Sequence, residues 1–353
     1  MTIVRIFLLF AAVLLHAGTV GAQEMTHLFG AEDAPRRLVI RSTTDTDIFS
    51  GVVEAFLEER PGVSILYEQW GSNDLYELTS KDCRSGRDGA DVVISSGVHQ
   101  MVKLVNDACA AKYRSNLTQV LPQALRWRDE LWGITREPAV IVYNRAEVPP
   151  VDVPRTRFDL LDLLRPEASP YAGRVATYDI EASGLGYLFA FMDSQEATTF
   201  GALLESLGRT GADATCCSAE IIEGVATGKY LLAYNVLGSY AEGFAREDDR
   251  IGIVLPQDYT LVLSRVLMIP KQAGNMADAR AFLDFLLSLK GRAELRQALL
   301  IAPSLDGETA DTGEAISETA LRPIGLSPSL LVALDRQKRD QFIRLWRGAF
   351  PGP

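Results

Sequence analysis

Hydrophobic residues between positions 37 and 105 follow two different spacings along the chain. Short apolar runs at residues 37–41 and 91–94, and alternating apolar residues at 63–67, predict three β-strands. Apolar residues three or four positions apart predict helices between these strands, as at Ile48, Phe49, Val52, Val53, Phe56 and Leu57. Each strand is followed by a polar turn and then by a helix. This repeated unit predicts an α/β fold with a doubly wound parallel sheet.

The pattern changes after residue 131, which indicates a second lobe. Residues 132–136 and 139–143 read as strands without a long helix between them, as expected where a chain crosses between lobes. The sequence then predicts strands at 174–178, 230–235, 251–255 and 260–269, and closing helices at 277–289, 293–300 and 330–346. We therefore expect two doubly wound lobes joined by crossover strands, with lobe 1 at 37–138, lobe 2 at 139–256 and lobe 1 again at 257–353.

The first 22 residues have the features of a secretory signal peptide. Arg5 precedes the uninterrupted apolar run Ile6–Leu15, and Val20-Gly21-Ala22 fits a peptidase cleavage site. The run is too short to span a bilayer core of about 30 Å as a helix, so an uncleaved membrane anchor is the weaker alternative. We expect a mature chain that starts near Gln23, an unstructured leader at 23–36, and export to the periplasm as a soluble protein.

Composition and charge narrow the range of partners. Hydrophobic residues make up 47% of the chain and charged residues 23%, which is typical of a globular protein. The formal net charge of −11 argues against nucleic-acid binding, because phosphate neutralisation needs a basic surface. This charge does not restrict a small ligand, since a pocket can be locally positive on an acidic protein.

The four cysteines allow three pairings. In an oxidising compartment we favour a disulfide between Cys83 and Cys109, which would staple a short segment. Cys216 and Cys217 would then remain as a pair of neighbours, either bonded to each other or present as free thiols. The cysteine spacing matches no zinc site, so we expect no bound metal at these residues.

The sequence lacks the motifs of the common enzyme classes. A Ser-His-Asp arrangement would have to use His99, and no nucleophile-elbow motif is present. The segment Gly224–Lys229 is one residue too short for a phosphate-binding P-loop. We therefore expect a binding protein rather than an enzyme, with no cofactor.

Several motifs resemble those of one known family. Asp91-Val-Val-Ile-Ser-Ser96 resembles the third strand and ligand turn of type 2 periplasmic solute-binding proteins of ABC transporters. Residues 220–235 resemble the helix, glycine turn and strand of their second lobe. The run Tyr234–Tyr240 resembles the branch that includes ferric-iron, hexose-phosphate and phosphoglycerate-type binding proteins. The resemblance covers nearly all of the mature chain and implies a monomer whose two lobes close on a ligand. Its membrane partner would be an ABC permease or, alternatively, a sensor kinase.

The resemblance also implies the positions of the ligand-binding residues. Carried over by position, the site comprises Ser42, Thr43, Thr44, Gly71, Ser72, Ser95, Ser96, Arg136, Glu137, Ser183, Gly184, Tyr234, Asn235, Ser239 and Tyr240. Some of these residues have a purely structural alternative, because serines of this kind cap helices and Tyr234 can fill the core.

The residue types at this site favour an anionic ligand over ferric iron. Iron-binding members of the branch often use adjacent tyrosines, whereas here Tyr234 and Tyr240 are separated and no Tyr-Tyr pair occurs. Hydroxyl groups, helix N-termini and one arginine suit a phosphate or a carboxylate. We expect a small anionic solute, either a phosphorylated sugar or an organic acid, with Arg136 as its main charge partner. A ferric-iron-binding protein of the same fold is the alternative.

Overall fold

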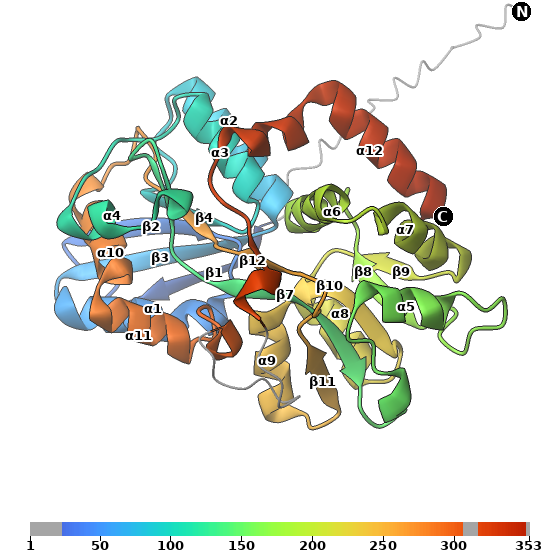
Figure 1. Cartoon of the computed structure of the whole chain (residues 1–353). Helices are drawn as coiled ribbons and strands as arrows, with labels where there is room; N and C mark the ends of the chain where they lie inside the picture. The colour runs from blue at the N-terminus through green and yellow to red at the C-terminus, as the bar shows by residue number, and fades with distance from the viewer. Residues whose placement is uncertain (1–22, 306–316, 351–353) are drawn as a thin grey trace, which may run out of the picture.

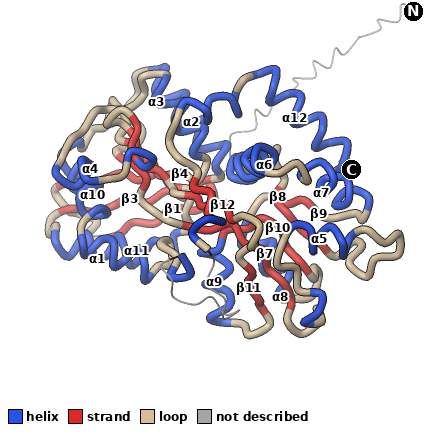
Figure 2. The backbone as a smooth tube through the Cα atoms, viewed as in Figure 1, coloured by secondary structure: helices blue, strands red, loops and turns tan. Residues whose placement is uncertain are grey.

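The computed structural model describes residues 23–305 and 317–350, which form two α/β lobes side by side (Figure 1). The predicted signal peptide, residues 1–22, lies outside the described residues. Each lobe contains a mixed β-sheet with helices on both faces, and the strands of the two sheets meet at the centre of the molecule (Figure 2). Within the described chain, no helix is both long enough and apolar enough to cross a membrane.

The sheet of lobe 1 has a parallel centre and antiparallel edges. Its strand order is β1 (Gln23–Phe29), β3 (Val63–Trp70), β2 (Arg36–Ser42), β4 (Val92–Ser95), β13 (Val266–Met268), β6 (Leu131–Gly133) and β5 (Arg126–Trp127). Strands β3, β2 and β4 pair in parallel, as the sequence predicts, whereas the outer strands pair antiparallel. The carboxyl ends of the parallel strands therefore point to one edge, where α/β sheets bind their ligands.

Apolar side chains attach helices to both faces of this sheet. The helices are α1 (Thr46–Glu59), α2 (Ser72–Ser85), α3 (Val98–Asn106), the short α4 (Asn116–Val120), α10 (Met276–Leu287) and α11 (Leu289–Gln297). On one face, Phe49 and Phe56 of α1 pack against Phe282 of α10. On the other face, α2 and α3 cover Val93 of β4.

Lobe 2 contains a second mixed sheet. Its strand order is β14 (Leu321–Pro323), β12 (Thr260–Leu263), β7 (Glu137–Asn144), β10 (Leu232–Leu237), β8 (Val175–Tyr178) and β9 (Asp213–Thr215), with β11 (Ile251–Val254) also paired to β7. The helices that follow these strands are α5 (Arg157–Leu164), α6 (Gly184–Glu196), α7 (Phe200–Arg209), α8 (Ser218–Ala226) and α9 (Gly238–Glu247). Helices α5 and α7 pack on one face and α8 and α9 on the other.

The expected unstructured leader at residues 23–36 is wrong, because it contains strand β1. This strand pairs antiparallel with β3, from Gln23 opposite Trp70 to Phe29 opposite Ile65. Its side chains are mostly exposed and only Phe29 is buried. This edge strand is therefore held by backbone hydrogen bonds to β3. Because such bonds do not depend on the side chains, the sequence of β1 shows no apolar alternation.

The return to lobe 1 occurs later than the expected boundary at residue 257. Strand β12 belongs to the sheet of lobe 2, and β13 belongs to the sheet of lobe 1. The segment predicted as one strand at 260–269 is thus two strands, separated by Ser264 and Arg265. A buried charged residue at this point ends the apolar run and allows the chain to change sheets.

The C-terminal segment does not return to lobe 1 alone, as was expected for residues 257–353. The 3₁₀ helix η5 (Pro328–Leu334) packs on α3 of lobe 1, whereas α12 (Arg336–Ala349) packs on α7 of lobe 2. Asp335 separates them, since its side chain caps α12 by accepting a hydrogen bond from the Lys338 N–H. This segment therefore connects the two lobes on the outside, above α6 in Figure 1.

We expect Trp346 to attach the C-terminal helix to lobe 2. Its side chain is 5% exposed and belongs to the apolar cluster that includes Tyr187 and Phe191 of α6. Trp346→Ala should lower the free energy of unfolding by about 3–5 kcal/mol, as for other buried aromatic residues. Leu345→Ala is the matched control, because Leu345 is 53% exposed. Equal urea denaturation midpoints for the two variants would contradict this packing.

We also expect His99 to make the fold sensitive to acid. His99 of α3 is buried and stacks on Tyr187 of α6 with ring centroids 5.5 Å apart. Burial lowers the pKa of its imidazole to about 3, compared with about 6.5 in an unfolded chain. The unfolded state therefore binds the proton first, so stability falls as the pH falls below about 6.5. Between pH 7 and pH 5, the His99→Phe variant should lose about 2 kcal/mol less stability than the protein with His99. Urea titrations at both pH values measure this; an unchanged pH dependence would refute it.

Candidate functional site

A cleft of about 330 Å³ lies between the two lobes. Lobe 1 lines it with the turns after β2, β3 and β4, and lobe 2 lines it with the turns after β8, β9 and β10. Of the residues expected at the site, six line this cleft: Thr43, Gly71, Ser72, Ser96, Ser183 and Tyr240. The remaining nine do not, and the contacts described below give the reason for each main group.

Helix N-termini converge on this cleft from both lobes. The N-cap residues of α1, α2, α6, α8 and α9 all line it, namely Asp45, Gly71, Ser183, Cys217 and Leu237. Ser96 lies one residue before the N-cap of α3. First-turn N–H groups have no partner inside their helix, and the helix dipole makes this end positive. The cleft is therefore suited to an anionic group.

A buried ion pair between the two crossover segments forms the base of the cleft. Arg265 Nε donates to Glu137 Oε1 at 2.9 Å, and both side chains are at most 1% exposed. Glu137 also accepts hydrogen bonds from Thr135 Oγ1 at 2.7 Å and from Ser239 Oγ at 2.6 Å. Burial by itself lowers the pKa of Arg265, but Glu137 and Tyr240 raise it above its usual value. Glu137 and Ser239 thus bind protein groups, and Glu137 neutralises the arginine.

The same arginine accounts for two other residues that were expected at the ligand. Arg265 Nη1 donates to the Thr43 carbonyl and to Thr44 Oγ1, each at 3.1 Å. Ser42 Oγ accepts the N–H of Thr44 at 3.0 Å, which stabilises the turn after β2. Ser95 Oγ performs the same role for Gly97 N–H at 3.0 Å. These hydroxyl groups shape the turns and do not line the cleft.

Hydrogen bonds cross the cleft and connect the lobes directly. Ser72 Oγ of lobe 1 accepts the Gly184 N–H of lobe 2 at 2.9 Å, so both residues bind each other. Asn73 Nδ2 donates to the Glu181 carbonyl at 2.9 Å. A Cβ atom at Gly184 would lie 2.7 Å from Gln100 Oε1, so a larger residue there would require the Gln100 side chain to shift. On the opposite side of the cleft, Tyr240 OH donates to Asp45 Oδ1 at 2.9 Å.

A wider groove of about 530 Å³ continues beyond the Asp45–Tyr240 contact. It lies between α1 and α11 of lobe 1 and α9 of lobe 2. Asp45, Ala219 and Tyr240 line both spaces. The Asp45–Tyr240 hydrogen bond is thus part of the partition between the cleft and the groove.

Both hydrogen-bond donors and hydrogen-bond acceptors line the cleft. Thr43 Oγ1 lies 3.1 Å from Ser96 Oγ and accepts the Ser96 N–H at 2.9 Å. Three carboxylates, those of Glu24, Asp45 and Asp74, also line the space. The cleft therefore offers both donors for an anion and acceptors for hydroxyl groups.

The two tyrosines of the cleft are protonated at neutral pH. Burial raises the pKa of Tyr178 to about 12 and also raises that of Tyr240. Tyr178 OH lies 2.6 Å from Ser218 Oγ and accepts the Leu237 N–H at 3.2 Å. Across residues 23–305 and 317–350, no three His, Cys, Asp or Glu side chains are grouped to bind a metal ion.

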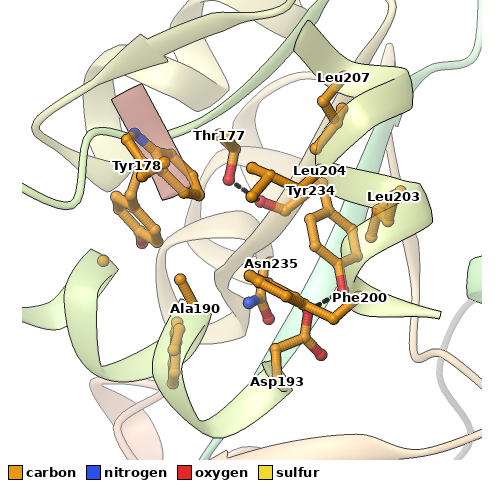
Figure 3. A pocket seen from close by; sticks show the side chains of 13 residues that line it. Thr177, Tyr178, Ala190, Asp193, Phe200, Leu203, Leu204, Leu207, Tyr234 and Asn235 are labelled. Carbon is orange, nitrogen blue, oxygen red and sulfur yellow. Dashed lines mark hydrogen bonds between the residues drawn. The ribbon is translucent and has the colours of Figure 1, made fainter. Parts of the chain in front are cut away.

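Tyr234 and Asn235 do not lie at the interlobe cleft, contrary to expectation. They line a separate cavity of about 20 Å³ between β10 and helices α6 and α7 (Figure 3). Arg157 Nε donates to Tyr234 OH at 2.6 Å, and Tyr234 OH donates to Asp193 (Figure 3). Asn235 has a φ of 64°, and the β10–β7 register shifts at this position. The irregularity lies within β10, which continues to Leu237, whereas the expected placement was carried over from the resemblance by position.

Arg136 is also displaced from its expected position. Its Nη1 donates to the Leu305 carbonyl at 3.0 Å, and its backbone bonds to Leu300 and Ala302. The residue therefore fixes the segment after α11 and does not line the cleft. Arg265 is the cleft arginine, and a single charge inside the apolar run at 260–269 was the available signal.

Other residues of the cleft were missed because their signals are weak. Asp45 follows the predicted Ser42–Thr44 turn directly, and Trp70 directly precedes Gly71. Cys216 and Cys217 are bonded to each other and line the cleft. The second disulfide joins Cys83 to Cys109 with a Cα–Cα distance of 5.4 Å, away from the cleft.

Sequence and structure comparisons give the class of protein. Residues 38–298 match the family of bacterial extracellular solute-binding proteins, and the chain belongs to that family. It is similar to the substrate-binding protein of an ABC transporter from Agrobacterium tumefaciens, at 33% identity and a TM-score of 0.85 over 93% of this chain and 99% of that chain. The family supports a periplasmic location and consists of binding proteins, not enzymes.

More distant structures share the type 2 periplasmic binding fold. Iron-bound HitA from Pseudomonas aeruginosa has 18% identity and a TM-score of 0.68, over 89% of this chain and 99% of that chain. AfuA from Actinobacillus pleuropneumoniae was solved with fructose 6-phosphate. It has 17% identity and a TM-score of 0.68, over 89% of this chain and 98% of that chain. No curated protein matches the sequence. The predicted fold and family are thus confirmed.

We expect the Arg265–Glu137 pair to be essential for stability. Arg265→Met would leave the Glu137 carboxylate buried without its partner, which should lower the free energy of unfolding by about 3–5 kcal/mol. Arg265→Met combined with Glu137→Gln should recover part of this loss, because the buried charge is removed with its partner. Urea denaturation of the three proteins measures both effects. A double variant that is less stable than the single one would argue against this account.

Proposed function

We propose that this protein captures a small anionic solute in the interlobe cleft and delivers it to an ABC permease in the inner membrane. The observation that carries the proposal is the convergence of five helix N-caps from both lobes on one cleft. An anion placed there would accept hydrogen bonds from both lobes and favour their closed arrangement. Arg136 does not line the cleft, and its Nη1 donates to the Leu305 carbonyl.

Not all of the helix N-termini are equally available to a solute. Side chains accept two N–H groups of α6, since Gly184 donates to Ser72 and Gly186 donates to Ser183. Gln69 accepts the Thr46 N–H of α1. We therefore assign anion binding chiefly to the first turns of α2, α8 and α9.

A phosphorylated sugar fits the cleft better than a simple organic acid. A sugar phosphate has an anionic group for the helix N-termini and hydroxyl groups for the carboxylates of Glu24, Asp45 and Asp74. An organic acid without hydroxyl groups would have no donor for these carboxylate acceptors. The volume of about 330 Å³ lies within the range of small-molecule sites. AfuA, a protein of the same fold, was solved with fructose 6-phosphate.

The ferric-iron ligand and the sensor-kinase partner are the two alternatives to this proposal. HitA gives the iron alternative its structural precedent, but the sequence contains no adjacent tyrosine pair. A sensor kinase could replace the permease as membrane partner. The similarity to a substrate-binding protein of an ABC transporter favours the permease.

Calorimetry on the mature chain is the direct test of ligand class. We expect fructose 6-phosphate to bind more tightly than inorganic phosphate or citrate. Inorganic phosphate lacks the sugar and its hydroxyl groups. Tight binding of ferric ion with a visible tyrosinate charge-transfer band would instead establish the iron alternative. N-terminal sequencing of periplasmic protein tests the proposed export, with Gln23 as the expected first residue, and light scattering tests the proposed monomer.

A pair of variants at Ala219 tests the sign of the ligand charge. Ala219 is the second residue of α8 and lines the cleft. Ala219→Asp and Ala219→Asn have nearly the same shape, and they differ by one negative charge. If the solute is an anion, the Asp variant should bind fructose 6-phosphate about tenfold more weakly than the Asn variant, through like-charge repulsion. Equal affinities in calorimetry would contradict anion binding near α8, and the opposite order would indicate a cationic solute.

A further inference from the structure

The disulfide between neighbouring residues Cys216 and Cys217 lies in the wall of the cleft. Cys217 is the N-cap of α8, one of the helices whose N-terminus lines the cleft. Cys216 is exposed and Cys217 is half-buried, so a reductant in solution can reach the bond. In contrast, Cys109 of the Cys83–Cys109 disulfide is buried. The two disulfides therefore differ in access as well as in position.

The turn that contains this disulfide is connected to two other parts of the cleft. Ser218, the next residue, has its Oγ 2.6 Å from Tyr178 OH. Tyr178 OH in turn accepts the Leu237 N–H at 3.2 Å, and Leu237 is the N-cap of α9. On the other side of the disulfide, the Thr215 carbonyl accepts the Asp179 N–H at 2.8 Å. A change at Cys216–Cys217 can thus reach the N-termini of α8 and α9 through direct contacts.

We propose that the Cys216–Cys217 disulfide is a redox-sensitive element of the solute site. When oxidised, it closes a small ring in the backbone that fixes the orientation of Cys217 and Ser218 at the start of α8. When reduced, this ring opens, the turn gains conformational freedom, and the donors at α8 and α9 are less well positioned for a solute. Reduction therefore weakens solute binding.

The reduction itself is a thiol–disulfide exchange with a dithiol. One thiolate of the dithiol attacks a sulfur of Cys216–Cys217 and forms a mixed disulfide, and the second thiol then releases it. Two electrons and two protons pass to the protein, which leaves two cysteine thiols, and the dithiol becomes a disulfide. Cys216 Sγ lies 3.8 Å from Glu220 Oε2, so the new thiol has a hydrogen-bond acceptor beside it.

The test combines one measurement without ligand and one with ligand. The mature protein isolated from the periplasm is treated with dithiothreitol, and mass mapping identifies the disulfide that has opened. Hydrogen exchange by NMR then follows the Asp179, Ile221 and Leu237 amides, which bond to Thr215, Cys217 and Tyr178. Calorimetry measures the affinity for fructose 6-phosphate in both redox states; only this second measurement rests on the proposed function.

Dithiothreitol should open Cys216–Cys217 before Cys83–Cys109, and exchange at the three amides should become faster. The affinity for fructose 6-phosphate should fall about tenfold, which corresponds to the loss of about one hydrogen bond. Cys216→Ala combined with Cys217→Ala should reproduce the reduced state and should no longer respond to dithiothreitol. Unchanged amide exchange after reduction would overturn the proposal, as would a double variant that behaves like oxidised protein. If oxidised protein does not bind fructose 6-phosphate, the ligand assignment fails, and the exchange data still decide the redox proposal.

Discussion

The buried ion pair between Arg265 and Glu137 is the contact on which the two crossover segments between the lobes depend. Glu137 begins the strand that enters lobe 2, and Arg265 lies between the strand that leaves lobe 2 and the one that rejoins lobe 1. Their ion pair joins the two crossover segments, and the Arg265 N–H also donates to Thr135 Oγ1 at 2.7 Å. A buried charge needs its partner, so neither residue can change alone. The position of this pair fixes the base of the cleft and the relative placement of the turns around it.

This constraint also determines how the cleft can bind a charge. Because Glu137 neutralises Arg265, the arginine adds little net positive charge to the cleft. The positive potential must come chiefly from helix N-termini, which are supplied by the fold itself. Parallel strands in each lobe direct their following helices to one edge, and the two edges face each other. An anionic solute, as proposed, would therefore be bound chiefly by helix N-termini.

The sequence predicted the fold well and the site only in part, for physical reasons. Helix and strand periodicity identified the parallel units, since buried faces leave a clear pattern, but β1 is held by backbone hydrogen bonds and leaves none. Turns after strands identified Thr43 and Ser96 correctly as cleft residues. Arg136 and Tyr234, expected at the ligand, do not line the cleft, because the sequence does not say to which side a residue near a strand end points. Their true partners, Leu305 and Asp193, are distant in sequence.

The hydrogen bonds across the cleft explain how a solute could bias closure. The Ser72–Gly184, Asn73–Glu181 and Tyr240–Asp45 contacts are formed with a cleft of about 330 Å³ still between them. A solute of suitable size can therefore bind inside without breaking them. Each such bond contributes only about 1 kcal/mol net. A solute that contacts α2 of one lobe and α8 or α9 of the other binds the closed form preferentially. That difference in affinity, and not the affinity alone, determines how far the solute shifts the protein toward the form that a membrane partner binds.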